Sequence, residues 1–174
     1  MSNYLQDPFV REISDDNRIF ESHNAQETRA LGLLIGEHVG AASVILLTGE
    51  MGSGKTILAQ GIGLGLGIST IINSPTFVLV NQYLSGRLPF CHADLYRLNG
   101  LEEIAQLALF EIASDGVLVV EWPERAAGDL PTDNLQLRFV PDRNEFFRTI
   151  HCHAHGPRSR ELLSHLDVVV KFGE

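Results

Sequence analysis

The residues of this chain with the clearest chemical meaning form a glycine-rich octapeptide that ends in a lysine and a threonine. Residues 49–56 read G-E-M-G-S-G-K-T and directly follow the apolar run of residues 44–47. A strand, a glycine-rich loop and a helix in this order let backbone N–H groups surround a phosphate, while the helix N-terminus adds its positive dipole. Lys55 is then expected to reach the β and γ phosphates, and the Thr56 hydroxyl to be a ligand of Mg²⁺.

Chance explains this loop poorly. The fractions of Gly, Lys and Ser plus Thr in the chain give on the order of 0.002 expected matches. The 13 basic residues include only two lysines, Lys55 and Lys171, yet one of them stands where the loop requires it. The loop residues expected to contact a nucleotide are Glu50, Met51, Gly52, Ser53, Gly54, Lys55 and Thr56.

Hydrolysis needs further acids, and two candidates lie at the end of, or within, predicted strands. Residues 117–120 predict a buried strand, and Glu121 is expected at its carboxyl end, beside the loop. There Glu121 can hold Mg²⁺ through a water or orient the attacking water; the alternative is a solvent-exposed glutamate at a strand end. His92 and Asp94 share one face of a strand, so Asp94 can position water or act as a base. Taken alone, this pair is equally consistent with a satisfied polar patch.

The segment N-S-P-T at residues 73–76 lies between the helix that follows the loop and the next predicted strand. Nucleotide switches place a hydroxyl that senses the γ-phosphate at such a position, which makes Ser74 and Thr76 candidates. A plain turn in which Pro75 fixes φ explains the same residues.

Three histidines, His151, His153 and His155, alternate along another predicted strand and therefore share one face. They suggest a transition-metal site. An exposed polar face without a metal is the alternative.

Composition limits the classes of protein. With 174 residues and 44% hydrophobic content, the chain can bury one good core. A net charge of -9 argues against a broad basic surface, so any polynucleotide is expected to be held by a partner. The two cysteines, Cys91 and Cys152, lack a paired spacing, and no apolar stretch is long enough to span a membrane. We therefore expect a cytoplasmic protein without a membrane contact.

The elements that must position these residues alternate in type. Strands are expected at residues 19–22, 43–48, 77–83, 88–96, 117–120, 135–140, 147–153 and 168–170, and helices at residues 24–40, 55–66, 101–112 and 158–166. This alternation predicts an α/β, three-layer P-loop NTPase fold with a central mixed, mainly parallel sheet. Residues 1–17 are expected to be a flexible N-terminal extension, and residues 18–174 a single P-loop ATPase domain.

In their order and spacing, these segments resemble one family, TsaE, the small bacterial ATPase needed for the threonylcarbamoyladenosine modification of tRNA. The resemblance covers roughly residues 24–140 and rests on the loop followed by S-P-T-F-V-L-V, H-A-D-L-Y-R-L and V-E-W-P-E. The strings S-P-T-F and H-x-D-L-Y-R are far more specific than the loop. The chain departs from the family pattern at Glu50 and Val78, where Asp and Thr are common.

The resemblance implies that Lys55, Asp94 and Glu121 carry catalysis, that Thr56 and Glu121 hold Mg²⁺, and that residues 74–76 form an ATP-dependent switch. It also implies that the ATPase is weak alone and acts with the proteins TsaD and TsaB, driving or resetting their transferase complex. tRNA is then contacted only indirectly, which suits the acidic charge. By the same analogy, residues 22–28 lie near the adenine.

Three alternatives remain open. A small-molecule kinase of the P-loop class is the main one, although kinases usually carry an arginine-rich lid and the arginines here are dispersed. A GTPase is disfavoured because the chain lacks an N-K-x-D string for guanine. A binding module with a purely structural nucleotide is the third.

Overall fold

The computed structural model describes residues 10–98, 100–105, 107–109, 111, 114–126, 130–142 and 147–170. Strands in this part form one sheet in the order β1-β2-β8-β7-β3-β6-β5-β4. They are β1 (Val10–Ile13), β2 (Asn17–Ser22), β3 (Ser43–Thr48), β4 (Val80–Tyr83), β5 (Phe90–Asp94), β6 (Val117–Glu121), β7 (Leu135–Pro141) and β8 (Arg148–Ala154). The helical elements are α1 (Ala25–His38), α2 (Lys55–Gly65), α3 (Leu101–Ala105), α5 (Pro157–Val170) and the 3-10 helix η1 (Pro123–Ala126).

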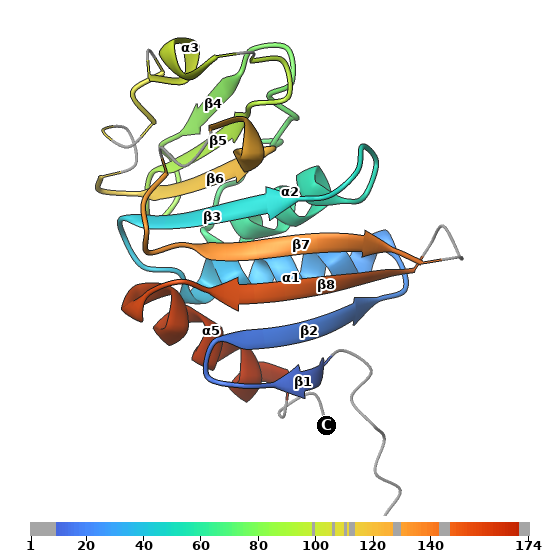
Figure 1. The fold of residues 1–174 in the computed structure, drawn as a ribbon. Helices are drawn as coiled ribbons and strands as arrows, with labels where there is room; N and C mark the ends of the chain where they lie inside the picture. Colours follow the sequence, from blue (N-terminus) through green and yellow to red (C-terminus); the bar gives the residue numbers. More distant parts are fainter. Residues whose placement is uncertain are drawn as a thin grey trace, which may run out of the picture.

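The sheet is parallel in its centre and antiparallel outside it (Figure 1). Strands β7, β3, β6 and β5 run parallel to one another. The pairs β1-β2, β2-β8, β7-β8 and β4-β5 are antiparallel. This arrangement confirms the prediction of a mixed sheet with a parallel centre.

The sheet separates two hydrophobic cores, which makes the architecture three-layered. One core joins the sheet to α1, α2 and α5, and the other joins β3, β5 and β6 to α3 and η1. Strand β6 is buried along its whole length because both of its faces are covered, whereas β7 and β8 alternate between buried and less buried residues. Continuous apolar runs are typical of such doubly covered parallel strands.

Glycines bring α1 and α2 unusually close together. A Cβ atom at Gly32 would lie 2.2 Å from the carbonyl oxygen of Leu58, and one at Gly61 would lie 2.2 Å from that of Arg29. No side chain fits at either position. Gly61 lowers the intrinsic stability of α2, and the close packing of α2 against α1 compensates for this cost.

Helix α1 begins as predicted. The side chain of Asn24 accepts a hydrogen bond from the Glu27 N–H at 2.9 Å, which caps the first turn. Its C-cap is Val39, one residue before the predicted Gly40.

Other boundaries differ from the predictions. Strand β1 pairs with β2 inside the segment expected to be a flexible extension, because backbone hydrogen bonds to a neighbouring strand stabilise a segment with little apolar patterning of its own. Residues 1–9 lie outside the described residues. Helix α3 ends at Ala105, and the left-handed φ of 47° at Ala108 departs from the helix predicted up to residue 112.

The C-terminal strand predicted at residues 168–170 is wrong, since α5 continues through Val170. Leu162, Leu163 and Leu166 of α5 are buried in the core, so packing of the helix overrides the strand propensity of the three valines. None of the helices in the described part of the chain has the length and apolar character needed to span a bilayer.

Candidate functional site

The predicted phosphate loop joins β3 to α2 and depends on its glycines. Gly49, Gly52 and Gly54 have φ values of 140°, 78° and 109°, which are conformations that residues with a Cβ atom rarely adopt. At Gly49 a Cβ atom would also lie 2.9 Å from the carbonyl oxygen of Phe139 on β7. The loop therefore has a backbone conformation that requires glycine at these positions. The same requirement is typical of phosphate-binding loops.

Lys55, the first residue of α2, is buried beneath this loop, with only 4% of its surface exposed. Its Nζ donates hydrogen bonds to the carbonyl oxygens of Gly49 and Glu50, both at 2.8 Å. The ammonium group also lies 4.5 Å from the centre of the Trp122 ring, a cation–π distance. Burial lowers the pKa of Lys55 from its usual 10.5, while the charges of Glu121, Asp94 and Glu124 oppose that shift. Lys55 thus places a cationic amine in the wall of a cavity that the loop also lines.

A hydroxyl and a carboxylate meet at the other side of the loop. The Thr56 Oγ1 donates a hydrogen bond of 2.9 Å to Oε1 of Glu121, which is 4% exposed. Magnesium prefers oxygen ligands and keeps several waters or substrate phosphates around it. Thr56 and Glu121 offer such oxygens, so the predicted pair of metal ligands fits Mg²⁺.

Asp94 stands directly opposite Glu121 in the parallel pairing of β5 with β6. Asp94 and Glu121 are the last residues of two adjacent parallel strands, so these two acids lie side by side at the carboxyl edge of the sheet. Asp94 is buried and its carboxylate accepts two hydrogen bonds, from the Thr76 hydroxyl at 2.6 Å and from the Tyr96 N–H at 2.9 Å.

Residues 74–79 form a tight turn rather than the start of the strand predicted from residue 77. The Ser74 and Thr76 hydroxyls lie 2.7 Å apart, and the N–H groups of Val78 and Leu79 both donate to the Pro75 carbonyl oxygen. Leu79 has a φ of 67°, an uncommon conformation for a branched side chain. The turn carries Thr76 to Asp94, and it leaves the Phe77 side chain 82% exposed.

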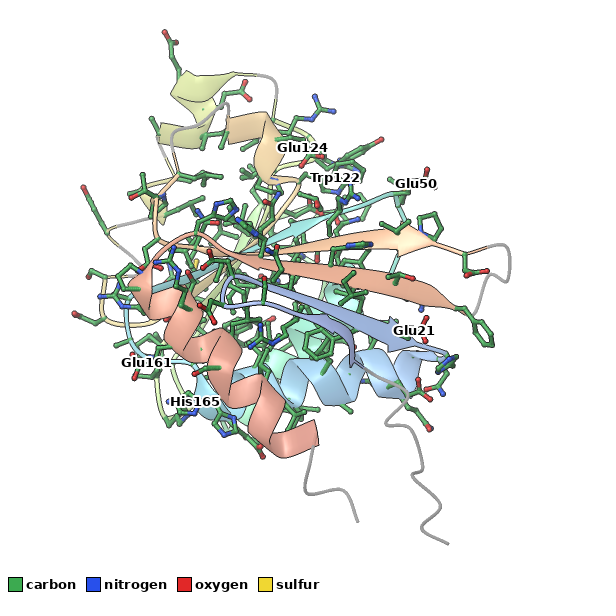
Figure 2. The ribbon with its side chains drawn as sticks, turned by 60° about the horizontal axis from the view of Figure 1, so that its bottom comes forward. Glu21, Glu50, Trp122, Glu124, Glu161 and His165 are labelled. Carbon is green, nitrogen blue, oxygen red and sulfur yellow. The ribbon has the colours of Figure 1, made fainter. Side chains whose placement is uncertain are left out.

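One cavity of about 300 Å³ is lined by all of the residues predicted for the phosphate loop, the switch, the metal and catalysis except Glu50. Figure 2 shows Glu50 on the segment that leaves β3, and Trp122 and Glu124 on the segment that leaves β6. Glu50 contributes its backbone carbonyl to Lys55 and does not line the cavity.

Three residues without a predicted role also line the cavity: Ile57, Tyr96 and Trp122. The Tyr96 and Trp122 rings lie 4.9 Å apart. Both directly extend predicted motifs, because Trp122 follows Glu121 and Tyr96 belongs to the H-A-D-L-Y-R run. Their position beside these motifs is the sequence feature that could have identified them as residues of the cavity.

The histidines near the end of β8 do not form a metal centre. In the part of the chain that the structure describes, no three His, Cys, Asp or Glu side chains are grouped to hold a metal ion. His153 lies 2.6 Å from Oδ1 of Asn17, and His155 lies 3.2 Å from Oε1 of Gln136. These contacts match the alternative of a polar face.

Residues 22–28, predicted as adenine contacts, do not line the cavity either. His23 instead pairs with Glu27 at 3.0 Å and contacts the Phe147 ring edge-on at 4.7 Å. A role in base binding stays a prediction.

Comparison with known proteins points to one family. The family model described as "Threonylcarbamoyl adenosine biosynthesis protein TsaE" matches residues 22–150. A relative from Treponema pallidum is 41% identical over 126 residues, covering 71% of this chain and 93% of the relative. A Nostoc relative is 48% identical over 106 residues, which span 58% of this chain and 64% of the relative. Both relatives carry the name tRNA threonylcarbamoyladenosine biosynthesis protein TsaE.

The fold is similar to the crystal structure of YdiB from Bacillus subtilis. The two share a TM-score of 0.75 and 29% sequence identity, and the match covers 92% of this chain and 97% of YdiB.

Proposed function

The chain belongs to the TsaE family of tRNA threonylcarbamoyladenosine biosynthesis, and from this premise we propose that it binds and hydrolyses ATP with Mg²⁺. The observation that carries the proposal is the 2.9 Å hydrogen bond between Thr56 and Glu121 in the cavity that Lys55 also lines. A phosphate-loop hydroxyl bonded to a strand-end carboxylate is the ligand pair that a nucleotide-bound magnesium ion needs.

The loop and Lys55 bind the triphosphate in this proposal. The backbone N–H groups of residues 50–56 and the Nζ of Lys55 supply the positive potential, and burial strengthens it because the local dielectric is low. The Trp122 ring and the two carbonyl oxygens hold the ammonium group in place. Less side-chain freedom then has to be lost when phosphate binds.

Thr56 and Glu121 hold the metal, which neutralises charge on the β and γ phosphate oxygens when it is bound. Asp94 accepts a hydrogen bond from the attacking water and orients it toward the γ-phosphorus. Its position opposite Glu121 supports this role, since the two carboxylates belong to one cavity. Thr76 binds Asp94 directly, so residues 74–76 link the γ-phosphate position to the outer surface.

We assign the ATPase an accessory role beside TsaD and TsaB, with tRNA contacted only through them, in the cytoplasm. The net charge of -9 disfavours direct binding of a polyanion. Phe77 and Val78 are exposed immediately after Thr76, and exposed apolar side chains next to a switch are surfaces that a partner covers. Cys91 and Cys152 are buried free thiols, which suits a reducing compartment.

Phosphate release tests the proposal. ATP turnover is measured with the purified chain alone and with TsaB and TsaD, without any small-molecule acceptor. We expect stimulation by the partners and loss of turnover in E121Q, with E161Q as the control, because Glu161 is an exposed residue of α5 that does not line the cavity. Transfer of the phosphate to a small molecule, or no phosphate release with both partners present, would overturn it.

A further inference from the structure

One oxygen of Glu121 is held from two directions. Oε1 accepts a hydrogen bond from Oγ1 of Thr56 on α2 and lies 2.9 Å from Nε2 of His92 on β5. Both distances are 2.9 Å, and the His92 side chain is completely buried. The orientation of this carboxylate is therefore determined by a side chain on the neighbouring strand as well as by the phosphate loop.

The surroundings of His92 define which ring nitrogen carries the proton. A carboxylate can only accept, so the hydrogen bond requires a proton on Nε2. The other nitrogen, Nδ1, is buried and has no hydrogen-bond partner among the described residues. An N–H group at that position would be left unsatisfied, which is costly in the interior. The Nε2–H tautomer avoids this cost.

Packing fixes the imidazole ring itself. It stacks on Phe90, with ring centres 6.2 Å apart and an interplanar angle of 26°. Phe90 is also fully buried in the core between the sheet and α2. His92 is thus a rigid donor, and its Nε2 cannot follow a carboxylate that moves far from its observed place.

A rigid donor matters because the acid is a glutamate. Glutamate has one more rotatable bond than aspartate, and ordering it costs more conformational entropy. Oε1 of Glu121 accepts from both Thr56 and His92, and neither of these donors contacts Oε2. The pair of donors thereby limits how the carboxylate can face the cavity.

We propose that His92 is a positioning residue for Glu121, which orders the carboxylate for metal binding. The inference rests on the proposed function, because it concerns the metal that accompanies the nucleotide. Groups that orient metal ligands typically change metal affinity by about 10- to 100-fold when they are removed. His92 itself does not bind the metal in this proposal.

The test uses binding of Mn²⁺ to the whole chain, followed by the electron paramagnetic resonance signal of free Mn²⁺ with a non-hydrolysable ATP analogue. H92L should weaken Mn²⁺ binding about tenfold or more. H92Q should retain most of the affinity, because the glutamine amide places an N–H near the Nε2 position. H92N should behave like H92L, because its shorter amide does not reach Glu121. Should H92L fail to fold, H92Q and H92N provide the same contrast.

A double-mutant cycle separates positioning from general damage to the fold. If His92 acts through Glu121, adding H92L to E121A should cause no further loss of Mn²⁺ affinity. Unchanged Mn²⁺ affinity in H92L, equal losses in H92Q and H92N, or additive losses in the double variant would overturn the inference. Affinity for the nucleotide in EDTA is measured in parallel and should be the same in all His92 variants. If the unsubstituted chain binds no nucleotide at all, the proposed function fails and the inference fails with it.

Discussion

The hydroxyl of Thr76 donates a hydrogen bond of 2.6 Å to Oδ2 of Asp94, joining the exposed turn at residues 74–79 to a buried acid of the cavity. The contact links a candidate sensor of the γ-phosphate to the candidate water-orienting group. Any movement of Thr76 toward a phosphate must lengthen or replace this hydrogen bond. The Asp94 N–H also donates a hydrogen bond of 2.9 Å to the carbonyl oxygen of Leu79, so the turn and this candidate acid are coupled by two contacts.

Removing the Thr76 hydroxyl tests this coupling. T76V keeps the size and branching of the side chain but cannot donate to Asp94. We expect partner-stimulated phosphate release to fall while ATP affinity changes little, because the loop and Lys55 supply most of the binding. T76S keeps the hydroxyl and should retain most of the activity. Equal activity in T76V and T76S would remove Thr76 from the switch.

Asp94 can be tested by an exchange that preserves its shape. The Thr76 hydroxyl and the Tyr96 N–H donate to different oxygens of Asp94. D94N keeps one acceptor oxygen, for the Tyr96 N–H, turns an amide NH2 toward the Thr76 oxygen, which can accept, and loses the negative charge. Loss of a general base or water-orienting group typically costs about 100- to 10,000-fold in rate. We expect single-turnover phosphate release to fall into this range, with nucleotide still bound. A D94N variant that hydrolyses ATP at the normal rate would show that another residue orients the water.

The contact between α1 and α2 predicts the stability of glycine variants. Alanine normally stabilises a helix interior relative to glycine by about 1 kcal/mol, yet the Cβ of G61A would lie 2.2 Å from the Arg29 carbonyl oxygen. We expect G61A to lower the free energy of unfolding by about 1–3 kcal/mol, as overpacking does. Urea unfolding measures this change. G40A is the matched control, because nothing lies within 4 Å of a Cβ at Gly40; equal stability of both variants would contradict the predicted clash.

The pH dependence of nucleotide binding follows from Lys55. Burial lowers its pKa from the usual 10.5, so the folded chain loses this proton at a lower pH than the unfolded chain. Between the two pKa values, the unfolded state binds more protons, and this group's contribution to the free energy of unfolding rises with pH. ATP affinity should move the opposite way, because the amine loses its charge in that window. Calorimetric titrations at increasing alkaline pH measure this loss, and K55R should delay it because arginine stays charged. A wild-type affinity that follows the K55R curve would exclude Lys55 as the titrating group.

Much of the site could be predicted from the sequence because its parts are local. The loop at residues 49–56 has a fixed spacing. Glu121 directly follows the strand predicted at residues 117–120, and Asp94 lies within the strand predicted at residues 88–96. The parallel pairing of β5 with β6, which places the two acids opposite each other, appears only in the folded chain.

The remaining features depend on contacts between distant segments. Local propensity does not reveal that α5 continues through Val170, because packing of its leucines on the core decides the outcome. The bond from His92 to Glu121 spans 29 residues and appears only after two strands have paired. Strand β1 forms for the same reason, as its hydrogen bonds go to β2.

The central claim is that the cavity bounded by the phosphate loop binds ATP. Isothermal titration of ATP with Mg²⁺ into the unsubstituted chain, K55A and R160A tests it most directly; Arg160 is an exposed cation on α5 that does not line the cavity. We expect binding by the unsubstituted chain and by R160A, and a large loss of affinity in K55A, because Lys55 is a buried cation that lines this cavity. Undiminished affinity in K55A, or no binding by the unsubstituted chain, would contradict it.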